Sequence, residues 1–170
     1  MRQIPVVDRR RDPLPVVEEF DGVPHSKQSL RLWLRLLRCS LTIEKRARRM
    51  LIDRFGTTLP RFDVLAALDR SSVGLTMGEL SELLLVSNGN VTIIVSRLAD
   101  DGLITRTAEK DDRRVMRVKL TAKGRRDFRT MAAEHEKWIE RLMADLSDIE
   151  TQQLLNGLNR VRASIERSGL

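Results

Sequence analysis

The sequence predicts a mainly α-helical fold with a small β-hairpin wing. Apolar residues recur at intervals of three and four over several long segments, which is typical of amphipathic helices. Near the middle of the chain two helix-start signals lie close together, and two segments rich in β-branched residues follow on either side of a charged turn. These observations predict a winged helix-turn-helix lobe plus a helical lobe built from the two ends of the chain.

Composition excludes several classes of protein. The chain has 170 residues, of which 41% are hydrophobic, so it can bury one sizeable core. Its apolar runs are far shorter than the roughly 18 residues that span a bilayer, and its arginine-rich start lacks the apolar stretch of a secretory signal. We therefore expect a cytoplasmic protein with no membrane partner. A single cysteine and two histidines form neither a disulfide scaffold nor a zinc cluster, and we expect no cofactor.

The charge balance points to a polyanionic partner. The 31 Lys and Arg residues exceed the 24 Asp and Glu residues, which gives a net charge of +7. This excess by itself fits nucleic acid, an anionic membrane surface or an ordinary solvated surface. Aromatic residues make up 4% of the chain and tyrosine is absent, which argues against stacking on single-stranded bases. If the partner is nucleic acid, a duplex is favoured.

An arm and two helices precede the helix-turn-helix. Residues 1–25 combine four of the five prolines with a run of arginines, which indicates an extended basic arm. A long amphipathic helix is predicted from Ser26 to Arg54, and Phe55-Gly56 ends it. Pro60 opens a second helix up to Asp69, because its missing N–H is tolerated in a first helical turn.

The middle of the chain carries the strongest local signals. Thr76 and Glu79 have the spacing of a capping box, which predicts a short helix from Met77 to about Leu85. Ser87 is predicted to cap a further helix that begins at Asn88. Two helices about two residues apart, each with a defined start, make a helix-turn-helix.

The second of these helices is predicted to expose a short polar face opposite its buried side. That face is almost uncharged, unlike an ordinary solvated face, and its composition is expected of groups that hydrogen-bond base edges. A simple polar surface with good caps is the alternative. The residues that look outward or sideways are Asn88, Asn90, Thr92, Ile93, Ser96 and Arg97.

A hairpin follows this helix directly, so it is predicted to be a wing. Asp101-Gly102 stops the helix, and residues 103–109 and 115–120 alternate as strands do. Arg113 and Arg114 lie near the tip. Asp112 is either a plain turn former or a brace that holds an arginine pointing outward.

Two long helices complete the chain. Thr121 is predicted to cap the first, and Ser147 with Glu150 forms a further capping box at the start of the second. Because these helices have no partner of their own kind in the middle lobe, we expect them to pair with those of a second chain. We therefore predict a DNA-binding domain over 57–121 and a helical dimerisation region over 26–56 and 122–170.

Several motifs resemble the multiple antibiotic resistance regulator (MarR) family of bacterial winged-helix transcription factors, over roughly residues 29–165. They are Leu75 to Leu80, the recognition helix into Arg97-Leu98, Asp101 to Ile104, Asp112 to Arg114, and Leu120 to Gly124. The resemblance implies a homodimer joined by the first and the last two helices. It further implies a recognition helix in the major groove of double-stranded DNA, a wing arginine in the minor groove, and a small ligand between the dimerisation helices and the DNA-binding lobe.

The resemblance also implies which residues contact DNA. They are Thr76, Ser87, Asn88, Asn90, Thr92, Ile93, Ser96 and Arg97, with Asp112 bracing and Arg113 or Arg114 probing the minor groove. Two features depart from the family pattern. The arm before Ser26 is longer than the usual start, and Ile93 lies where a polar contact is more ordinary. Oxidation-sensing members have a reactive cysteine in the first helix, whereas Cys39 is expected to be a buried, inert thiol.

The first helix is unusually basic, which bears on the ligand. From Ser26 to Arg54 it has nine basic and two acidic residues, a balance equal to that of the whole chain. Five of the basic residues share one stripe of the helix: Arg31, Arg35, Arg38, Lys45 and Arg49. This stripe is either a solvated face or a binding face for a phosphate-bearing or carboxylate ligand. Residues 30–35 and 55–63 are similar to a subgroup that responds to coenzyme A thioesters of aromatic acids. The expected ligand contacts are Leu34, Arg35, Leu37, Arg38, Leu41, Phe62 and Ala66.

The leading interpretation is a homodimeric repressor that binds a palindromic operator and is released by an aromatic acid or its CoA thioester. An architectural or nonspecific DNA-coating protein is the rival, since it would use the same basic surface without an operator or a ligand. The sequence contains no Gly-rich phosphate loop, nucleophile elbow or Cys and His pair, so an enzyme is not expected.

Overall fold

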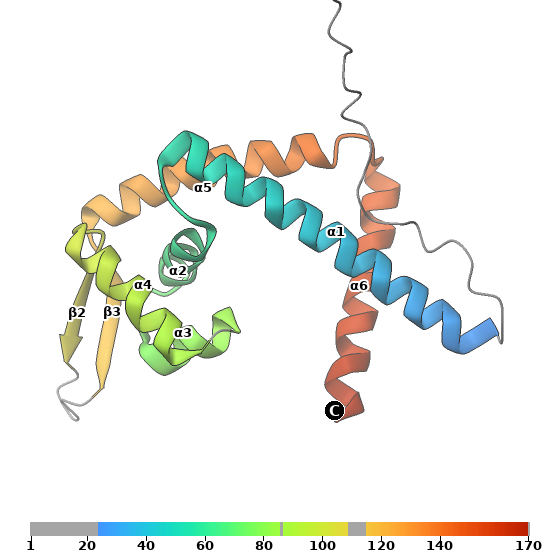
Figure 1. Ribbon diagram of the computed structural model, residues 1–170, viewed down its shortest axis with the longest axis horizontal. Coiled ribbons are helices and arrows are strands. Elements are labelled where there is room, and N and C mark those ends of the chain that lie inside the picture. Colours follow the sequence, from blue (N-terminus) through green and yellow to red (C-terminus); the bar gives the residue numbers. More distant parts are fainter. Residues whose placement is uncertain (1–23, 86, 109–114, 170) are drawn as a thin grey trace, which may run out of the picture. The chain divides into compact units, whose positions relative to one another are not determined.

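The computed structural model describes residues 24–85, 87–108 and 115–169, except for the side chains of residues 24–26 and 88. Over these residues the fold is mainly α-helical with a small antiparallel sheet, as predicted (Figure 1). The elements are α1 (Pro24–Phe55), α2 (Leu59–Asp69), β1 (Leu75–Thr76), α3 (Met77–Leu84), α4 (Asn88–Asp100), β2 (Ile104–Ala108), β3 (Met116–Leu120), α5 (Ala122–Leu142) and α6 (Asp148–Ser168). No helix in the described part of the chain has the length and apolar character that crossing a membrane requires.

The chain divides into two compact units, and the boundary between Lys45 and Arg46 falls within α1. In the first unit, α1 exposes large apolar side chains that include Leu30 and Trp33. Cys39 is also exposed, so the prediction of a buried thiol is wrong. The reason is helical periodicity, because Cys39 shares a face with Arg35 and Thr42, whose side chains are exposed as well.

The core of the second unit lies where α2, α3 and α4 meet the sheet. Figure 1 shows these three helices grouped beside the β2–β3 hairpin. Burial of each large apolar side chain stabilises such a core by about 2 kcal/mol. The fully buried side chains are Leu51, Val64, Leu65, Leu68, Leu80, Val91, Val95, Leu98 and Val118. Most of them come from 57–121, the predicted DNA-binding domain, and they give α4 a rigid support.

The sheet has one strand more than the predicted hairpin. β3 is central and pairs antiparallel with β2 on one side and with β1 on the other. β1 was not predicted because two residues are too few to show an alternating pattern. Gly74 permits the pairing, since its φ is +85° and a Cβ there would lie 2.5 Å from the Val118 carbonyl oxygen.

Three of the four predicted helix caps are confirmed. The Thr76 hydroxyl accepts a hydrogen bond from the Glu79 amide at 3.2 Å, while the Glu79 carboxylate accepts one from the Thr76 amide at 2.7 Å. The bond from the Thr76 amide, together with the Thr76 side chain, lowers the pKa of Glu79. Ser147 and Glu150 form the same box at the start of α6, and Thr121 caps α5.

The fourth predicted cap is different. Ser87 lies at the start of α4 with an extended backbone, but its hydroxyl forms no capping hydrogen bond. The prediction of a side-chain cap at Ser87 is therefore wrong. The exposed Ser87 contributes its backbone instead, because its carbonyl oxygen accepts a hydrogen bond from the Val91 amide at 3.2 Å.

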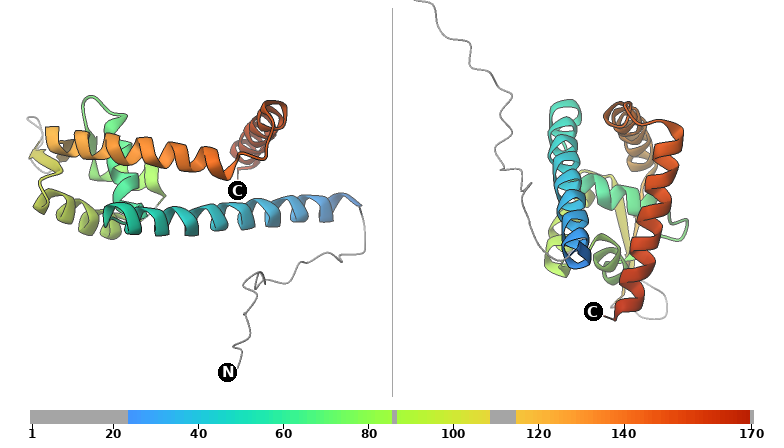
Figure 2. Two further views of the ribbon diagram at one scale, coloured as in Figure 1. Left: turned by 90° about the horizontal axis from the view of Figure 1, so that it is seen from above. Right: turned by 90° about the vertical axis from the view of Figure 1, so that its right-hand side faces the viewer.

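The two C-terminal helices differ in burial. α5 buries Phe128 and Met131 against the core, and Phe128 packs on Phe62 with ring centroids 5.5 Å apart. Figure 2 shows that the chain changes direction between α5 and α6. α6 has no buried residue, and its apolar side chains Leu154 and Leu158 are 53% and 46% exposed. The described residues leave this apolar face of α6 uncovered, which is typical of an interaction surface.

Candidate nucleic-acid interface

The turn between α3 and α4 presents α4 at the surface of the second unit. α3 ends at Leu85, which adopts a left-handed backbone with φ of 52°, an uncommon conformation for a residue with a branched side chain. α4 then buries Val91, Val95 and Leu98 in the core. Its opposite side is left open to solvent.

The exposed side of α4 carries most of the side chains predicted to contact DNA. Ser96 is half-buried, and the Asn88 side chain lies outside the described residues. Thr76 lies elsewhere, at the start of α3, where its hydroxyl accepts the capping hydrogen bond. The exposed members of the predicted set are Ser87, Asn90, Thr92, Ile93 and Arg97. They form a surface of small polar groups with one cation and one large apolar side chain.

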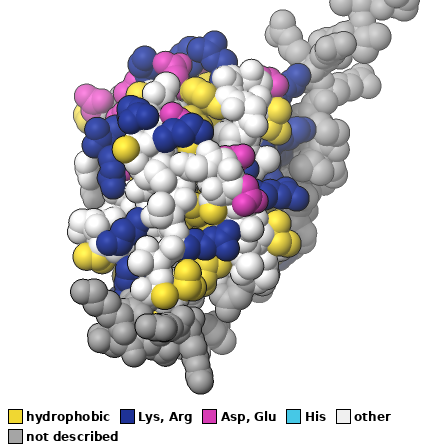
Figure 3. Space-filling model, turned by 90° about the vertical axis from the view of Figure 1, so that its left-hand side faces the viewer, with side chains coloured by type: hydrophobic (Ala, Val, Ile, Leu, Met, Phe, Trp, Pro, Cys, Tyr) yellow, Lys and Arg dark blue, Asp and Glu magenta, His cyan; other side chains and the backbone are white. Residues whose placement is uncertain are grey.

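The wing adds basic groups beside this surface. Arg106 on β2 and Lys119 on β3 are exposed. Figure 3 shows the wing side of the molecule, where dark blue Lys and Arg side chains are spread over the surface. The predicted minor-groove residues Asp112, Arg113 and Arg114 lie outside the described residues. The strands that lead toward them are in the predicted places.

Arg117 links the wing to the helix-turn-helix, and the sequence analysis missed it. Its Nη1 donates to the Gly74 carbonyl oxygen at 3.0 Å and lies 3.7 Å from Oε2 of Glu79, in the α3 capping box. Arg117 also pairs with Thr76 in the register of β1 and β3. β1 is too short to be predicted from the sequence, and without it nothing indicates that Arg117 reaches the start of α3.

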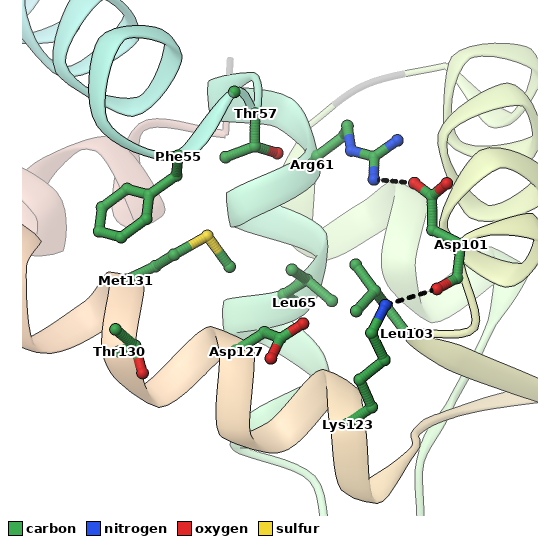
Figure 4. A pocket seen from close by; sticks show the side chains of 11 residues that line it. Phe55, Thr57, Arg61, Leu65, Asp101, Leu103, Lys123, Asp127, Thr130 and Met131 are labelled. Carbon is green, nitrogen blue, oxygen red and sulfur yellow. Dashed lines mark hydrogen bonds and ion pairs between the residues drawn. The ribbon is translucent and has the colours of Figure 1, made fainter.

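The end of α4 is held by two basic side chains from other helices. The Arg61 guanidinium, on α2, donates a hydrogen bond to the Asp101 carboxylate (Figure 4). Lys123 Nζ, on α5, donates to the Asp101 carbonyl oxygen at 3.0 Å. The Arg61 bond, aided by both positive charges, lowers the pKa of Asp101. The residue after α4 is thus tied to α2 and α5, which fixes the direction of α4.

A cavity of about 520 Å³ lies beside this cluster. Figure 4 shows Phe55, Leu65 and Met131 among its lining side chains, with Arg61 and Asp101 at another part of the wall. Arg61 Nε is buried and has no hydrogen-bond partner. Among the described residues, no cluster of His, Cys, Asp or Glu side chains is arranged to hold a metal ion.

The residues predicted to bind the effector do not line this cavity. Two of them belong to the second unit, where Phe62 is buried in the core and Ala66 is half-buried. The others belong to the first unit. There Leu34, Arg35 and Leu41 are exposed, and Leu37 and Arg38 are half-buried.

Comparison with known proteins places the chain in a family. A model of the MarR family matches residues 55–115, which include α2, α3, α4 and β2. A solved structure of a MarR family transcriptional regulator from Silicibacter pomeroyi is 30% identical, with a TM-score of 0.73 over 85% of this chain and 99% of that chain. The chain belongs to the MarR family. It is therefore a transcriptional regulator of a DNA-binding family and not an enzyme, as the motifs predicted.

Two further relatives bear on this MarR protein. The transcriptional activatory protein BadR of Rhodopseudomonas palustris is 28% identical over 152 residues, which cover 86% of each chain. CouR of Rhodococcus jostii RHA1, solved with bound p-coumaroyl-CoA, has a TM-score of 0.66 and 19% identity over 76% of this chain and 90% of that chain. The likeness to CouR shows the shared fold.

Proposed function

We propose that this MarR protein is a homodimeric repressor that binds an inverted-repeat operator and is released by an aromatic acid or its CoA thioester. The observation that carries the proposal is the exposed side of α4. A helix fits the major groove of B-DNA, and amide, hydroxyl and guanidinium groups match the donors and acceptors of base edges. The buried side of α4 holds those groups on a rigid core.

The uncovered face of α6 supports the homodimer. Leu154, Leu158, Val161 and Ile165 recur at helical spacing, and none of them is buried. A second copy presents the same stripe, so a two-fold contact would cover both. We assign dimerisation to 26–56 and 122–170 and DNA binding to 57–121.

Two recognition helices related by a two-fold axis require an operator with two-fold symmetry. We assign the base contacts to the exposed α4 residues and the minor-groove contacts to Arg113 or Arg114, braced by Asp112. Arginine suits a narrow minor groove because of the enhanced negative potential there. The operator half-sites should therefore have A·T-rich flanks.

An arginine substitution on α4 tests the base contacts. An operator is first selected by enriching a randomised duplex library on the purified protein. Arg97→Ala should lower the affinity for this selected operator about 10-fold or more in fluorescence anisotropy, because a good base contact contributes about 1–3 kcal/mol. Arg141→Ala removes an exposed arginine at the end of α5 and should leave the affinity unchanged. Equal losses in both variants would favour a nonspecific DNA-coating protein.

In the first unit, the effector contacts are assigned to the predicted residues of α1. The exposed leucines offer an apolar surface for an aromatic ring, and Arg35 and Arg38 offer donors for a carboxylate or a phosphate. CouR, which has the same fold, binds a ligand of this class. A ligand weakens DNA binding only if its affinities for the free dimer and for the DNA-bound dimer differ. A coupling free energy of about 1–3 kcal/mol lowers the affinity for DNA roughly 5- to 150-fold.

Benzoate and p-coumaroyl-CoA are the probes for this site. At least one of them should dissociate the complex with the selected operator, and Arg35→Ala and Arg38→Ala should each raise the required concentration about tenfold. Arg46→Ala, at an exposed position further along α1, is the control and should have no effect. Release that is equal in all variants would remove the arginines from the site. Failure of both probes would contradict the ligand class.

The name of BadR favours activation as a second candidate. A regulator bound upstream of a promoter raises transcription, whereas one bound across it blocks transcription. A reporter driven by the promoter next to the selected operator separates the two. Expression that rises when the protein is deleted supports the repressor, and expression that falls supports the activator.

A further inference from the structure

One large apolar side chain interrupts the polar surface of α4. Ile93 is 56% exposed. It lies between Asn90 and Arg97, three residues after the first and four before the second, so the three side chains form one row on the helix. Packing in the core does not account for an apolar side chain at Ile93, because the buried side of α4 consists of Val91, Val95 and Leu98.

Gly89 leaves Ile93 prominent in this row. Gly89 lies one turn before Ile93, and no heavy atom comes within 4 Å of the position that a Cβ would occupy there. The surface of α4 is therefore low on that side of Ile93. From Asn90 to Arg97 the helix rises about 10.5 Å, which matches about three base-pair steps. From Ile93 to Arg97 the helix rises about 6 Å, so a base contacted by Ile93 would lie about two base pairs from the one contacted by Arg97.

The chemistry of the major groove leaves few partners for an isoleucine. Its base edges present hydrogen-bond donors, acceptors and the 5-methyl group of thymine. Isoleucine cannot replace the water bound to a donor or an acceptor, so pressing it against one leaves that group without a partner at a cost of about 1–3 kcal/mol. When isoleucine packs against the thymine methyl group, the apolar surfaces of both groups are removed from water, which makes binding more favourable.

We propose that Ile93 recognises the 5-methyl group of one thymine in each operator half-site, about two base pairs from the base pair contacted by Arg97. The inference rests on the proposed function, since it requires α4 in the major groove. It adds a specificity that the polar groups of α4 do not supply: preference for thymine at one position through an apolar contact.

Deoxyuridine in the selected operator tests the inference, because it removes the methyl group and leaves the base-pairing edge intact. Each thymine is replaced in turn, symmetrically in both half-sites, and affinity is measured by fluorescence anisotropy. At one position, the affinity of the parent protein should fall about fourfold per half-site, which is the effect of one buried methyl-sized group. Replacement in both half-sites should lower the affinity about 15-fold. Ile93→Ala should bind the thymine and deoxyuridine duplexes equally well.

Asn90→Ala is the matched control. It should bind more weakly overall yet keep the deoxyuridine penalty of the parent at the same position. The inference is overturned if no position shows a penalty, or if Ile93→Ala keeps the full penalty, and in both cases the proposed function stands as long as the protein selects an operator. Failure to enrich any sequence overturns the proposed function and this inference with it.

Discussion

Leu154→Lys combined with Leu158→Lys should lower the affinity for the selected operator at least about 100-fold. The proposed dimer buries both leucines against a second copy of α6, and a lysine there would leave a charge without a partner in an apolar contact. A monomer reaches one half-site only. It therefore loses the gain in avidity that a second linked site provides, which is about 10²- to 10⁴-fold.

A double variant on the other side of α6 is the control. Asn156→Lys combined with Asn159→Lys adds the same charge, at exposed positions roughly opposite the leucine stripe. It should sediment as a dimer at micromolar concentration and bind the operator like the parent, whereas the leucine variant should sediment as a monomer. A leucine variant that stays dimeric with parental affinity would show that α6 does not form the interface.

Gly124→Ala should lower the free energy of unfolding by about 3 kcal/mol, at the upper end of the usual cost of overpacking. A Cβ at Gly124 would lie 1.9 Å from the Leu103 carbonyl oxygen and 2.8 Å from its carbonyl carbon. That carbonyl cannot shift easily, because it accepts hydrogen bonds from the Thr121 amide at 3.0 Å and from the Thr121 hydroxyl at 3.2 Å. The start of α5 would have to move away from the end of the helix-turn-helix.

Gly89→Ala is the matched control for stability. No heavy atom lies within 4 Å of a Cβ at that position, so the added methyl meets no protein atom, and alanine favours the helix. Urea unfolding of both variants without DNA, at one protein concentration, gives the comparison. If Gly124→Ala unfolds at the same urea concentration as the parent, the close packing of α5 on Leu103 is not present in solution.

The helices and the exposed side of α4 were predictable because their signals are local. A capping box occupies four consecutive residues, and Thr76 shows both of its hydrogen bonds in the structure. In the same way, the apolar spacing of Val91, Val95 and Leu98 marks one side of α4, so the opposite side follows from helical geometry. Ile93 stood out for another reason, because it departs from the pattern of the family that the chain resembles.

Other features were hidden because they depend on residues far apart in the chain. Arg61 and Asp101 are 40 positions apart, and their contact requires the packing of α2 beside the end of α4. Arg117 reaches the α3 capping box only because β1 pairs with β3, and β1 is too short to have a sequence pattern. Local signals also misled at Ser87, which has the sequence position and extended backbone of a cap residue but whose hydroxyl forms no capping hydrogen bond.

Two α4 helices of a dimer are expected to bind neighbouring half-sites of one operator. Hydroxyl-radical footprinting of the parent protein on the selected operator measures this binding. Two protected regions should appear with centres about 10 base pairs apart, and both should be lost in the variant with Leu154→Lys and Leu158→Lys. Uniform protection along the duplex, or a footprint that this variant leaves unchanged, would contradict it.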